Sequence, residues 1–479
     1  MTSTKRAWLG AIVLLCGTLL LRPAIAWAHA HLVKAVPAAG SMVSAPPTAI
    51  RLWFSEKPER TLTKVALTNA NGTVVAVGPP AADSAGPLVI AVPVSGVLAP
   101  GSYTVTWSTA AADGHPSNGR FTFRVAASAA AAGTAPAGAV PPAPDSQPPS
   151  TLANPDAGVR VVGSIPDTAA TTAAAAASAV TPAFIAVRAV TFAALLAMIG
   201  AASFRLFVLP RIAGIDSASR ASIAASIASR AAIVAAIYVL AALVRLYLQD
   251  RMMTGSAAVD AAHLRAMSMD TDWGAAWRMQ TYGGVFALVA FLVARAKGAV
   301  GWPMAAFAMV ILALATTKGS HAVVSERHQV LSGLADTVHI LGAGGWMGSL
   351  LWMALAALPI IQASHEPRAA RAAALVHAFS PSALANAGVV GASGLVSAWV
   401  RLGTVTALWN TSYGQVLLVK LTLLAALAAI GFHNWKHVQP ALGTDEATAR
   451  LERSATLELF VGALVVVVTA ILVATPTPT

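Results

Sequence analysis

The part of the chain beyond residue 181 consists of apolar segments separated by short polar connections. Inside a bilayer every backbone N–H and C=O must be paired within the protein, so only helices and closed barrels can span it. Each segment is about long enough to cross as a helix, and 57% of all residues are hydrophobic against 10% charged. The eight segments centre near 183–208, 226–248, 279–297, 302–319, 330–361, 376–400, 414–435 and 456–474. We therefore predict an all-α polytopic membrane bundle of eight transmembrane helices over residues 182–475.

The basic residues predict how this bundle is oriented. If the N-terminal part is exported, an even number of spans returns the C-terminus to the outside, and cytoplasmic loops are expected to be rich in Lys and Arg. The loops that then lie inside carry Arg205, Arg211, Arg220, Arg230, Arg295, Lys297, Arg368, Arg371, Lys436, Arg450 and Arg453. We read the net charge of +12 as this loop bias and not as nucleic-acid binding. The pattern predicts a multi-pass protein of the bacterial inner (plasma) membrane, with both ends of the mature chain in the periplasm or extracytoplasmic space.

The first 28 residues have the order of a secretion signal. Lys5 and Arg6 precede an apolar run over 7–21, and Ala26-Trp27-Ala28 offers a small-x-small cleavage site that exposes His29. The overlapping Ala28-His29-Ala30 is an alternative site, and cleavage there exposes His31. The chain's one cysteine, Cys16, falls in the segment removed, so no thiol, disulfide or Cys-bound metal is expected in the mature protein.

Residues 29–126 are more polar and alternate between apolar and polar side chains. Four runs read as strands, separated by Gly, Pro and Asn breaks: 50–54, 63–67, 103–107 and 121–125. This spacing over about a hundred residues predicts an all-β Greek-key sandwich. Residues 127–181 consist almost wholly of Ala, Pro, Gly, Ser, Thr and Val, and we predict a disordered linker there.

An N-terminal histidine is an unusual ligand, because its free amine and its imidazole can close on one metal ion as a chelate. Cleavage after Ala28 would make His29 such a residue. Asp113 and His115 are two positions apart, which on an extended strand places both side chains on one face. Nitrogen and oxygen donors in a flat arrangement suit Cu(II), which also heads the affinity order of the divalent ions.

The soluble part resembles CopC, the periplasmic copper-binding β-sandwich. The motifs that carry the resemblance are His29-Ala30-His31-Leu32, Pro37-Ala38-Ala39-Gly40-Ser41, Phe54-Ser55-Glu56, Asp113-Gly114-His115-Pro116 and Gly119-Arg120-Phe121-Thr122-Phe123. The resemblance implies that His29, Asp113 and His115 bind Cu(II), and that Glu56 is a further candidate near the metal. The family's spacing favours His29 over His31 as the first mature residue. With Met42 as the one methionine of this domain, a Met-rich Cu(I) site is not expected.

The membrane half is similar to CopD, the inner-membrane partner of CopC. The motifs are Asp336-Thr337-Val338-His339, Gly345-Trp346-Met347-Gly348, Tyr413-Gly414, Leu417-Leu418-Val419-Lys420-Leu421, Arg453-Ser454 and Glu458. A CopC–CopD fusion implies copper binding, copper transport (with import the favoured direction) and a role in copper homeostasis or resistance. It implies no enzyme activity. Its partners would be copper ions, the bilayer and other periplasmic copper proteins, and neither nucleic acid nor ATP.

Several membrane residues are candidates for a transport pathway. Asp336 and His339 are three residues apart and share one helix face at membrane depth, where ionisable groups are costly and usually functional. His321 lies near the same outer mouth. The loop between spans two and three holds Met252, Met253, Met267 and Met269 beside His263. Thioether and imidazole suit Cu(I) where no cysteine is present, although imidazole binds Cu(II) as well, so the oxidation state in this half stays open.

Two other classes of protein also fit parts of the pattern. An oxidative copper enzyme can use an N-terminal histidine chelate, but about a hundred residues leave little room for a substrate platform. A membrane b-type cytochrome holds haem between paired histidines on neighbouring helices. His377 and His433 are the pair nearest to matching depth.

Overall fold

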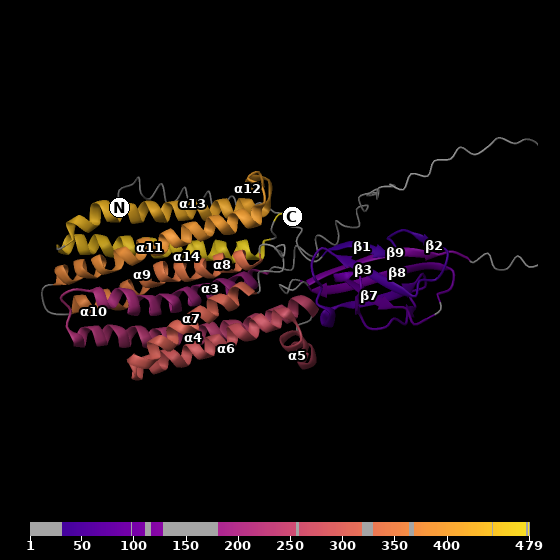
Figure 1. Ribbon diagram of the computed structural model, residues 1–479, viewed down its shortest axis with the longest axis horizontal. Coiled ribbons are helices and arrows are strands. Elements are labelled where there is room, and N and C mark those ends of the chain that lie inside the picture. Colours follow the sequence, from indigo (N-terminus) through magenta and orange to yellow (C-terminus); the bar gives the residue numbers. More distant parts are fainter. Residues whose placement is uncertain are drawn as a thin grey trace, which may run out of the picture.

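The computed structural model describes residues 31–96, 98–110, 116–127, 181–254, 258–318, 329–363, 368–442, 444–475 and 478. Figure 1 shows two bodies end to end, a β-sheet domain and a longer bundle of helices. The predicted signal peptide and most of the predicted linker lie outside the described residues, so their boundaries stay predictions.

The β-domain is built from two sheets. Its strands are β1 (Leu32–Val36), β2 (Met42–Val43), β3 (Ala49–Phe54), β4 (Lys64–Asn69), β5 (Val74–Val75), β6 (Ala81–Asp83), β7 (Gly86–Pro93), β8 (Gly101–Ala110) and β9 (Pro116–Val125). One sheet has the order β1-β3-β7-β6 and the other β2-β9-β8-β4-β5. The longest ladder joins β8 and β9, in register from Gly101 opposite Val125 to Ala110 opposite Pro116.

Alternating side chains of both sheets form the core of this sandwich. Ile50, Leu52 and Phe54 point inward from β3, as the apolar positions of the run 50–54 predicted. Phe54 meets Trp107 of β8 edge-on, with 5.2 Å between the ring centroids. The buried residues of this cluster all come from positions 35–125, so the sandwich has a hydrophobic core of its own. All four predicted strands are confirmed, as β3, β4, β8 and β9.

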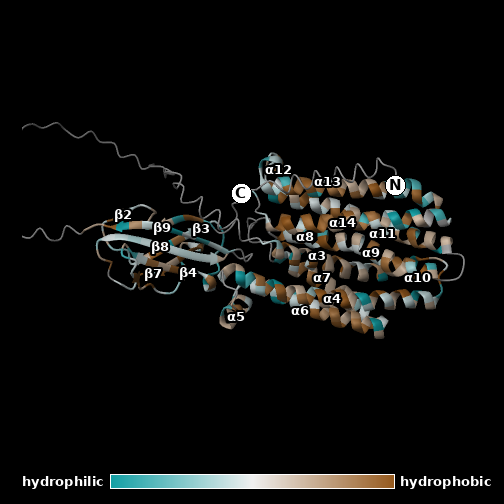
Figure 2. Cartoon of the chain, turned by 180° about the vertical axis from the view of Figure 1, so that it is seen from behind, coloured by the Kyte–Doolittle hydropathy of each residue, from teal (hydrophilic) through white to brown (hydrophobic). Residues whose placement is uncertain are grey.

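Eight helical segments of the described chain are long and apolar enough to cross a membrane, at the places predicted. They are α3 (Pro182–Ser203), α4 (Ser217–Thr254), α6 (Asp272–Ala296), α7 (Gly298–Lys318), α8 to α10 (Gln329–Ala343, Ser349–Trp352 and Leu358–Ala363), α11 (Arg368–Leu402), α13 (Ser412–His433) and α14 (Asp445–Ala474). Two short helices, α5 (Ala261–Met269) and α12 (Ala407–Asn410), lie between spans. Figure 2 shows that apolar residues dominate the helices of the bundle, as a lipid-facing surface requires.

Threonine caps set where three of the spans begin. Thr181, Thr271 and Thr411 each accept a hydrogen bond from the backbone N–H three residues on, at Phe184, Gly274 and Gly414. A hydroxyl at this position pairs one of the N–H groups that the first helical turn leaves without an acceptor. α3, α6 and α13 therefore start at defined residues.

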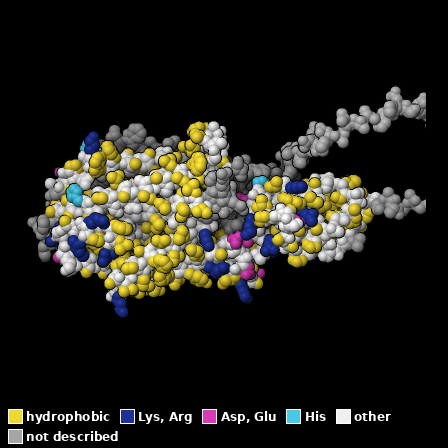
Figure 3. All heavy atoms as spheres, in the orientation of Figure 1, with side chains coloured by type: hydrophobic (Ala, Val, Ile, Leu, Met, Phe, Trp, Pro, Cys, Tyr) yellow, Lys and Arg dark blue, Asp and Glu magenta, His cyan; other side chains and the backbone are white. Residues whose placement is uncertain are grey.

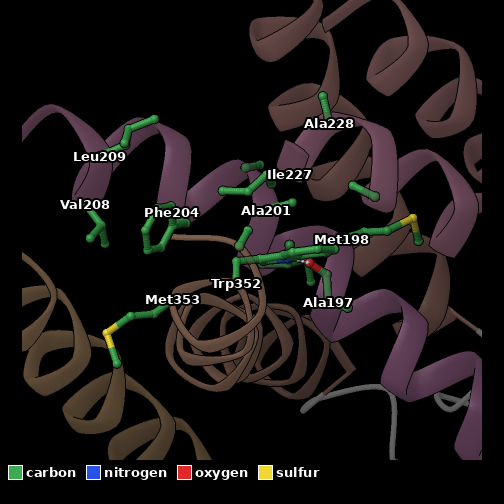
Figure 4. Close-up of a cluster of buried hydrophobic side chains, with 14 of the residues drawn as sticks. Ala197, Met198, Ala201, Phe204, Val208, Leu209, Ile227, Ala228, Trp352 and Met353 are labelled. Atoms are coloured by element: carbon green, nitrogen blue, oxygen red, sulfur yellow. Dashed lines mark hydrogen bonds between the residues drawn. The ribbon is translucent and has the colours of Figure 1, made fainter. Parts of the chain in front are cut away.

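The fifth span packs closely against the first. It contains two π-helical turns, η6 (Gly344–Gly348) and η7 (Met353–Ala357), so the motif Gly345-Trp346-Met347-Gly348 forms a π-turn. Gly200 of α3 meets the backbone of Gly348 so closely that neither position has room for a Cβ atom. Small residues permit such an approach of two membrane helices. Figure 4 shows Trp352 lying beside Ala197, Met198 and Ala201, and its indole N–H donates to the Ala197 carbonyl at 2.7 Å.

The two ends of the bundle differ in charge. α5, α12 and the β-domain lie at one end, and α10 lies at the other (Figure 1). The turns after α3 and after α6, on the α10 side, carry Arg211 and Lys297. Arg220 at the start of α4 donates to the carbonyls of Leu209 and Ile212, at 2.9 and 2.7 Å, and so closes the first of these turns. The basic residues that sequence analysis assigned to the inside thus belong to the end away from the β-domain.

Candidate metal sites and the contact between the two domains

The predicted Cu(II) ligands His29, Asp113 and His115 lie outside the described residues, but the chain that follows His29, from His31 on, and the chain on both sides of residues 111–115 are described. His31 donates its backbone N–H to the Ser55 hydroxyl at 3.1 Å, just before β1 pairs with β3. Ala110 ends β8, and its carbonyl accepts from the Glu59 backbone N–H at 2.8 Å. The residues that lead into the predicted ligands therefore meet at one end of the sandwich.

Glu56 lies in the same end of the sandwich, in the turn after β3. Glu56 is half-buried, and its carboxylate oxygen Oε2 is enclosed by protein. This placement is consistent with the weaker expectation that Glu56 stands near the metal, and the prediction stays open.

This end of the sandwich is the one that contacts the membrane bundle. Lys57 forms an ion pair with Asp272, the first residue of α6, with 2.7 Å between Nζ and Oδ2. The carboxylate of Glu59 accepts the backbone N–H of Asp272 at 2.8 Å. The first N–H groups of a helix have no acceptor inside the helix, and the helix dipole favours a negative charge there. The β-domain thus supplies a carboxylate to the N-terminal end of α6, and Figure 3 shows acidic and basic side chains gathered at this junction.

An apolar contact accompanies these polar ones. Leu62 and Ala110 of the sandwich share a buried cluster with Met267, Trp273 and Trp277 of α5 and α6. Burial raises the pKa of the Glu59 carboxyl above its ordinary value, and the hydrogen bond to Asp272 raises the pKa of Lys57. Glu59 is therefore desolvated, whereas the side chains of Lys57 and Asp272 are 55% and 60% exposed, so their ion pair is a surface pair that contributes little to stability.

We predict that a zero-length carbodiimide reagent will join Lys57 to Asp272 in the folded chain. The amine and the carboxylate are in direct contact, so the isopeptide can form without a spacer. The linked peptides can be identified by mass spectrometry. Lys57→Arg is the matched control, because it keeps the charge but has no reactive amine. The contact would be refuted if other surface lysines reacted and this linkage were missing.

The four methionines predicted between spans two and three have different surroundings. Met253 and Met267 both join the cluster that underlies the sandwich, and Met267 is fully buried. Met269 is exposed, and its sulfur lies 3.8 Å from Arg278 Nη1, a cation that opposes metal binding there. Met252 is half-buried. Met253 and Met267 therefore lie together in the cluster beneath the sandwich, whereas Met269 is exposed.

Sequence analysis placed His263 at this corner but missed its partner, Asp250. His263 of α5 and Asp250 of α4 form an ion pair or hydrogen bond with 2.5 Å between Nδ1 and Oδ1, and the Asp250 side chain is 1% exposed. The signal was present in the sequence as a histidine next to a methionine-rich loop, but nothing in the spacing showed that Asp250 would face it.

Asp336 and His339 extend from α8 toward α11, as their shared helix face predicted. Asp336 forms an ion pair with Arg401 and accepts the Ser397 hydroxyl at 2.9 Å. Arg401 also interacts with the Tyr413 hydroxyl, and Lys420 of α13 is electrostatically coupled to the pair. The carboxylate is thus held within a polar network that joins α8, α11 and α13.

His339 has a different environment from Asp336. Its Nδ1 lies 3.2 Å from the carbonyl oxygen of Val390 and 3.2 Å from the Ser393 hydroxyl. Because a carbonyl can only accept, Nδ1 carries the proton in this arrangement. Nε2 then presents a lone pair, which can bind a metal ion or accept a proton. Of Asp336 and His339, therefore, His339 is the residue whose side chain has a lone pair available to a metal ion.

The structure describes two of the remaining predicted histidines, His377 and His433, and gives each a different neighbour. His321 lies outside the described residues. His377 pairs with Gln439 at 3.2 Å, and the ring of His433 lies 4.9 Å from that of His437. Within the described ranges no three His, Cys, Asp or Glu side chains are grouped closely enough to hold a metal ion.

Comparison with known proteins covers both halves of the chain. The CopC domain model matches residues 32–126, the model "Copper resistance protein D-like, N-terminal domain" matches 173–327, and "Copper resistance protein D" matches 373–472. Copper transport protein CutJ of Bacillus subtilis (strain 168) is 25% identical over 472 residues, covering 96% of this chain and 76% of CutJ.

The sandwich also has relatives of its own. Protein YobA of Escherichia coli (strain K12) is 37% identical over 125 residues, which cover 26% of this chain and 99% of YobA. The crystal structure of CopC from Methylosinus trichosporium OB3b is 27% identical, covers 21% of this chain and 95% of that chain, and gives a TM-score of 0.20. The chain belongs to the copper resistance family and joins a CopC domain to copper resistance protein D domains in one polypeptide.

Proposed function

We propose that this protein binds Cu(II) outside the membrane through His29, Asp113 and His115 and moves copper inward through its membrane half. Membership of the copper resistance and transport family supports copper as the metal that is bound and moved. The amine and imidazole of an N-terminal His29, with a carboxylate and a second imidazole, match the tetragonal preference of Cu(II). Glu56 is the further candidate at that site.

One observation carries the proposal beyond family membership. The end of the sandwich from which the chain leads into the predicted ligands packs on α5 and α6, through Lys57, Glu59 and Leu62. Copper released at that end is already at the outer surface of the bundle, where its local concentration is raised as for any tethered ligand.

The proposed orientation places the sandwich in the periplasm. The turns at the opposite end of the bundle contain Arg211 and Lys297, and positively charged loops stay in the cytoplasm. Eight spans then return the C-terminus to the periplasmic side. Inside the membrane, the lone pair on His339 Nε2 is the proposed ligand for the metal, and the ion pair with Asp336 offsets the positive charge of Arg401.

The proposal is tested by the copper content of cells that express the chain. We expect more intracellular copper, measured by mass spectrometry, than in cells with an empty vector. A variant with His29, Asp113 and His115 replaced by Ala, expressed to the same level, should accumulate less at low external copper. Equal or lower copper content in cells with the intact chain would contradict import.

A further inference from the structure

The corner between α4 and α5 contains a carboxylate that is almost sealed from solvent. Asp250 is 1% exposed, and its Oδ1 lies 2.5 Å from His263 Nδ1. Its second oxygen, Oδ2, is buried and has no hydrogen-bond partner among the described residues. Burying a carboxylate is costly unless it is paired, so the histidine is held firmly against it.

One ring nitrogen of His263 remains available to a metal ion. Because Nδ1 faces the carboxylate, Nε2 is the ring nitrogen that remains for another partner, and it makes no hydrogen bond within the described part of the chain. Histidines that bind metal ions usually donate their other ring N–H to a carboxylate in this way, which fixes the ring and strengthens it as a ligand.

Two thioethers share the helix faces of this pair. Met253 follows Asp250 by three residues on α4, and Met267 follows His263 by four on α5, so each lies one turn further along the same face. Both side chains enter the same cluster as Trp273. The cation Arg245 lies over the Trp273 ring of this cluster and donates to Gln280 at 2.8 Å.

We propose that His263 Nε2, with the sulfurs of Met253 and Met267, forms a Cu(I)-binding site at the outer surface of the bundle, with Asp250 as its positioning residue. Imidazole and thioether are the donors that Cu(I) accepts where thiolate is absent. The site lies under Leu62 and Ala110 of the docked sandwich, because these residues pack on Met267. It deepens the proposed function by naming an entry site for the metal, and it rests on that function for its role in transport. No electron transfer is assigned to it.

The test uses the full chain in lipid nanodiscs, with Cys16→Ser so that methionine is the only source of sulfur. Cu(I) supplied with ascorbate is titrated against a chromophoric Cu(I) chelator, and Cu–S scattering is measured by X-ray absorption. His263→Ala and the double variant Met253→Leu/Met267→Leu should each lose one tightly bound Cu(I), and the double variant should also lose Cu–S scattering. Met→Leu changes conserve volume and are well tolerated in cores, and Met269→Leu is the matched control that should bind as the parent does.

Asp250→Asn separates positioning from folding. It keeps the shape and an oxygen that can accept from His263 but removes the charge, so Cu(I) affinity should fall by about 10- to 100-fold while the Cu–S signature persists. Unchanged Cu(I) stoichiometry and sulfur scattering in the His263 and double methionine variants would overturn the site. That result is independent of the proposed function, which fails instead if cells with the parent chain gain no copper.

Discussion

One extra residue ahead of His29 is expected to weaken Cu(II) binding by about a hundredfold or more. The added residue converts the terminal amine into a peptide amide, whose nitrogen lone pair is delocalised into the carbonyl and is a poor donor to the metal. The imidazole then binds alone and loses the gain in effective concentration that the second arm of a chelate provides. The EPR spectrum should change accordingly, from a nitrogen-rich tetragonal pattern to one with fewer nitrogen ligands.

The measurement can be made on residues 29–126 alone, since the sandwich has its own hydrophobic core. Asp113→Ala and His115→Ala should each weaken binding as well. His31→Ala should matter little, because the described hydrogen bonds of His31 are made by its backbone N–H and C=O groups. Equal Cu(II) affinity of the extended and the authentic domain would show that the terminal amine is not a ligand.

Asp336→Ala is expected to deplete the protein from the membrane and to abolish copper accumulation. The side chains of Asp336 and Arg401 are 13% and 20% exposed, so removal of the carboxylate leaves a largely buried guanidinium without its counter-ion. Breaking such a pair costs about 3–5 kcal/mol. Membrane abundance by immunoblot and copper content per cell are the two readouts.

The double variant Asp336→Leu/Arg401→Met distinguishes folding from transport. Replacing both charges removes the unpaired cation, so abundance should recover. His339→Ala keeps the ion pair intact and should therefore retain abundance but lose accumulation, since it removes the Nε2 lone pair. Normal accumulation by well-expressed His339→Ala would take this histidine out of the pathway.

The sequence was sufficient to predict the eight spans and four of the strands, but not the other strands or the short helices between the spans. Every span needs a long apolar run, and every strand of a sandwich alternates between core and solvent, so both leave periodic signals. The run 50–54 became β3, and the segment centred on 330–361 became the fifth span. The π-turns within that span left no comparable signal, because they depend on how Gly348 meets Gly200 across the bundle.

The contacts between distant charges could not be predicted. Lys57, Glu59 and Asp272 each resemble a solvated surface charge in the sequence, and only the docking of two domains brings them together. Asp336 was correctly identified as an unusual membrane carboxylate, but its partner Arg401 looked like a loop arginine at a helix end. Spacing along one helix predicts shared faces, whereas the partner across the interface depends on tertiary packing.

Copper uptake by sealed proteoliposomes tests the central claim most directly. The purified chain is reconstituted with no other protein, copper is added outside, and the metal trapped in the lumen is measured by mass spectrometry after external chelation. Vesicles containing the parent chain should trap copper faster than protein-free vesicles and faster than vesicles containing His339→Ala at equal protein content. Equal rates in all three preparations would contradict a transport function for this protein.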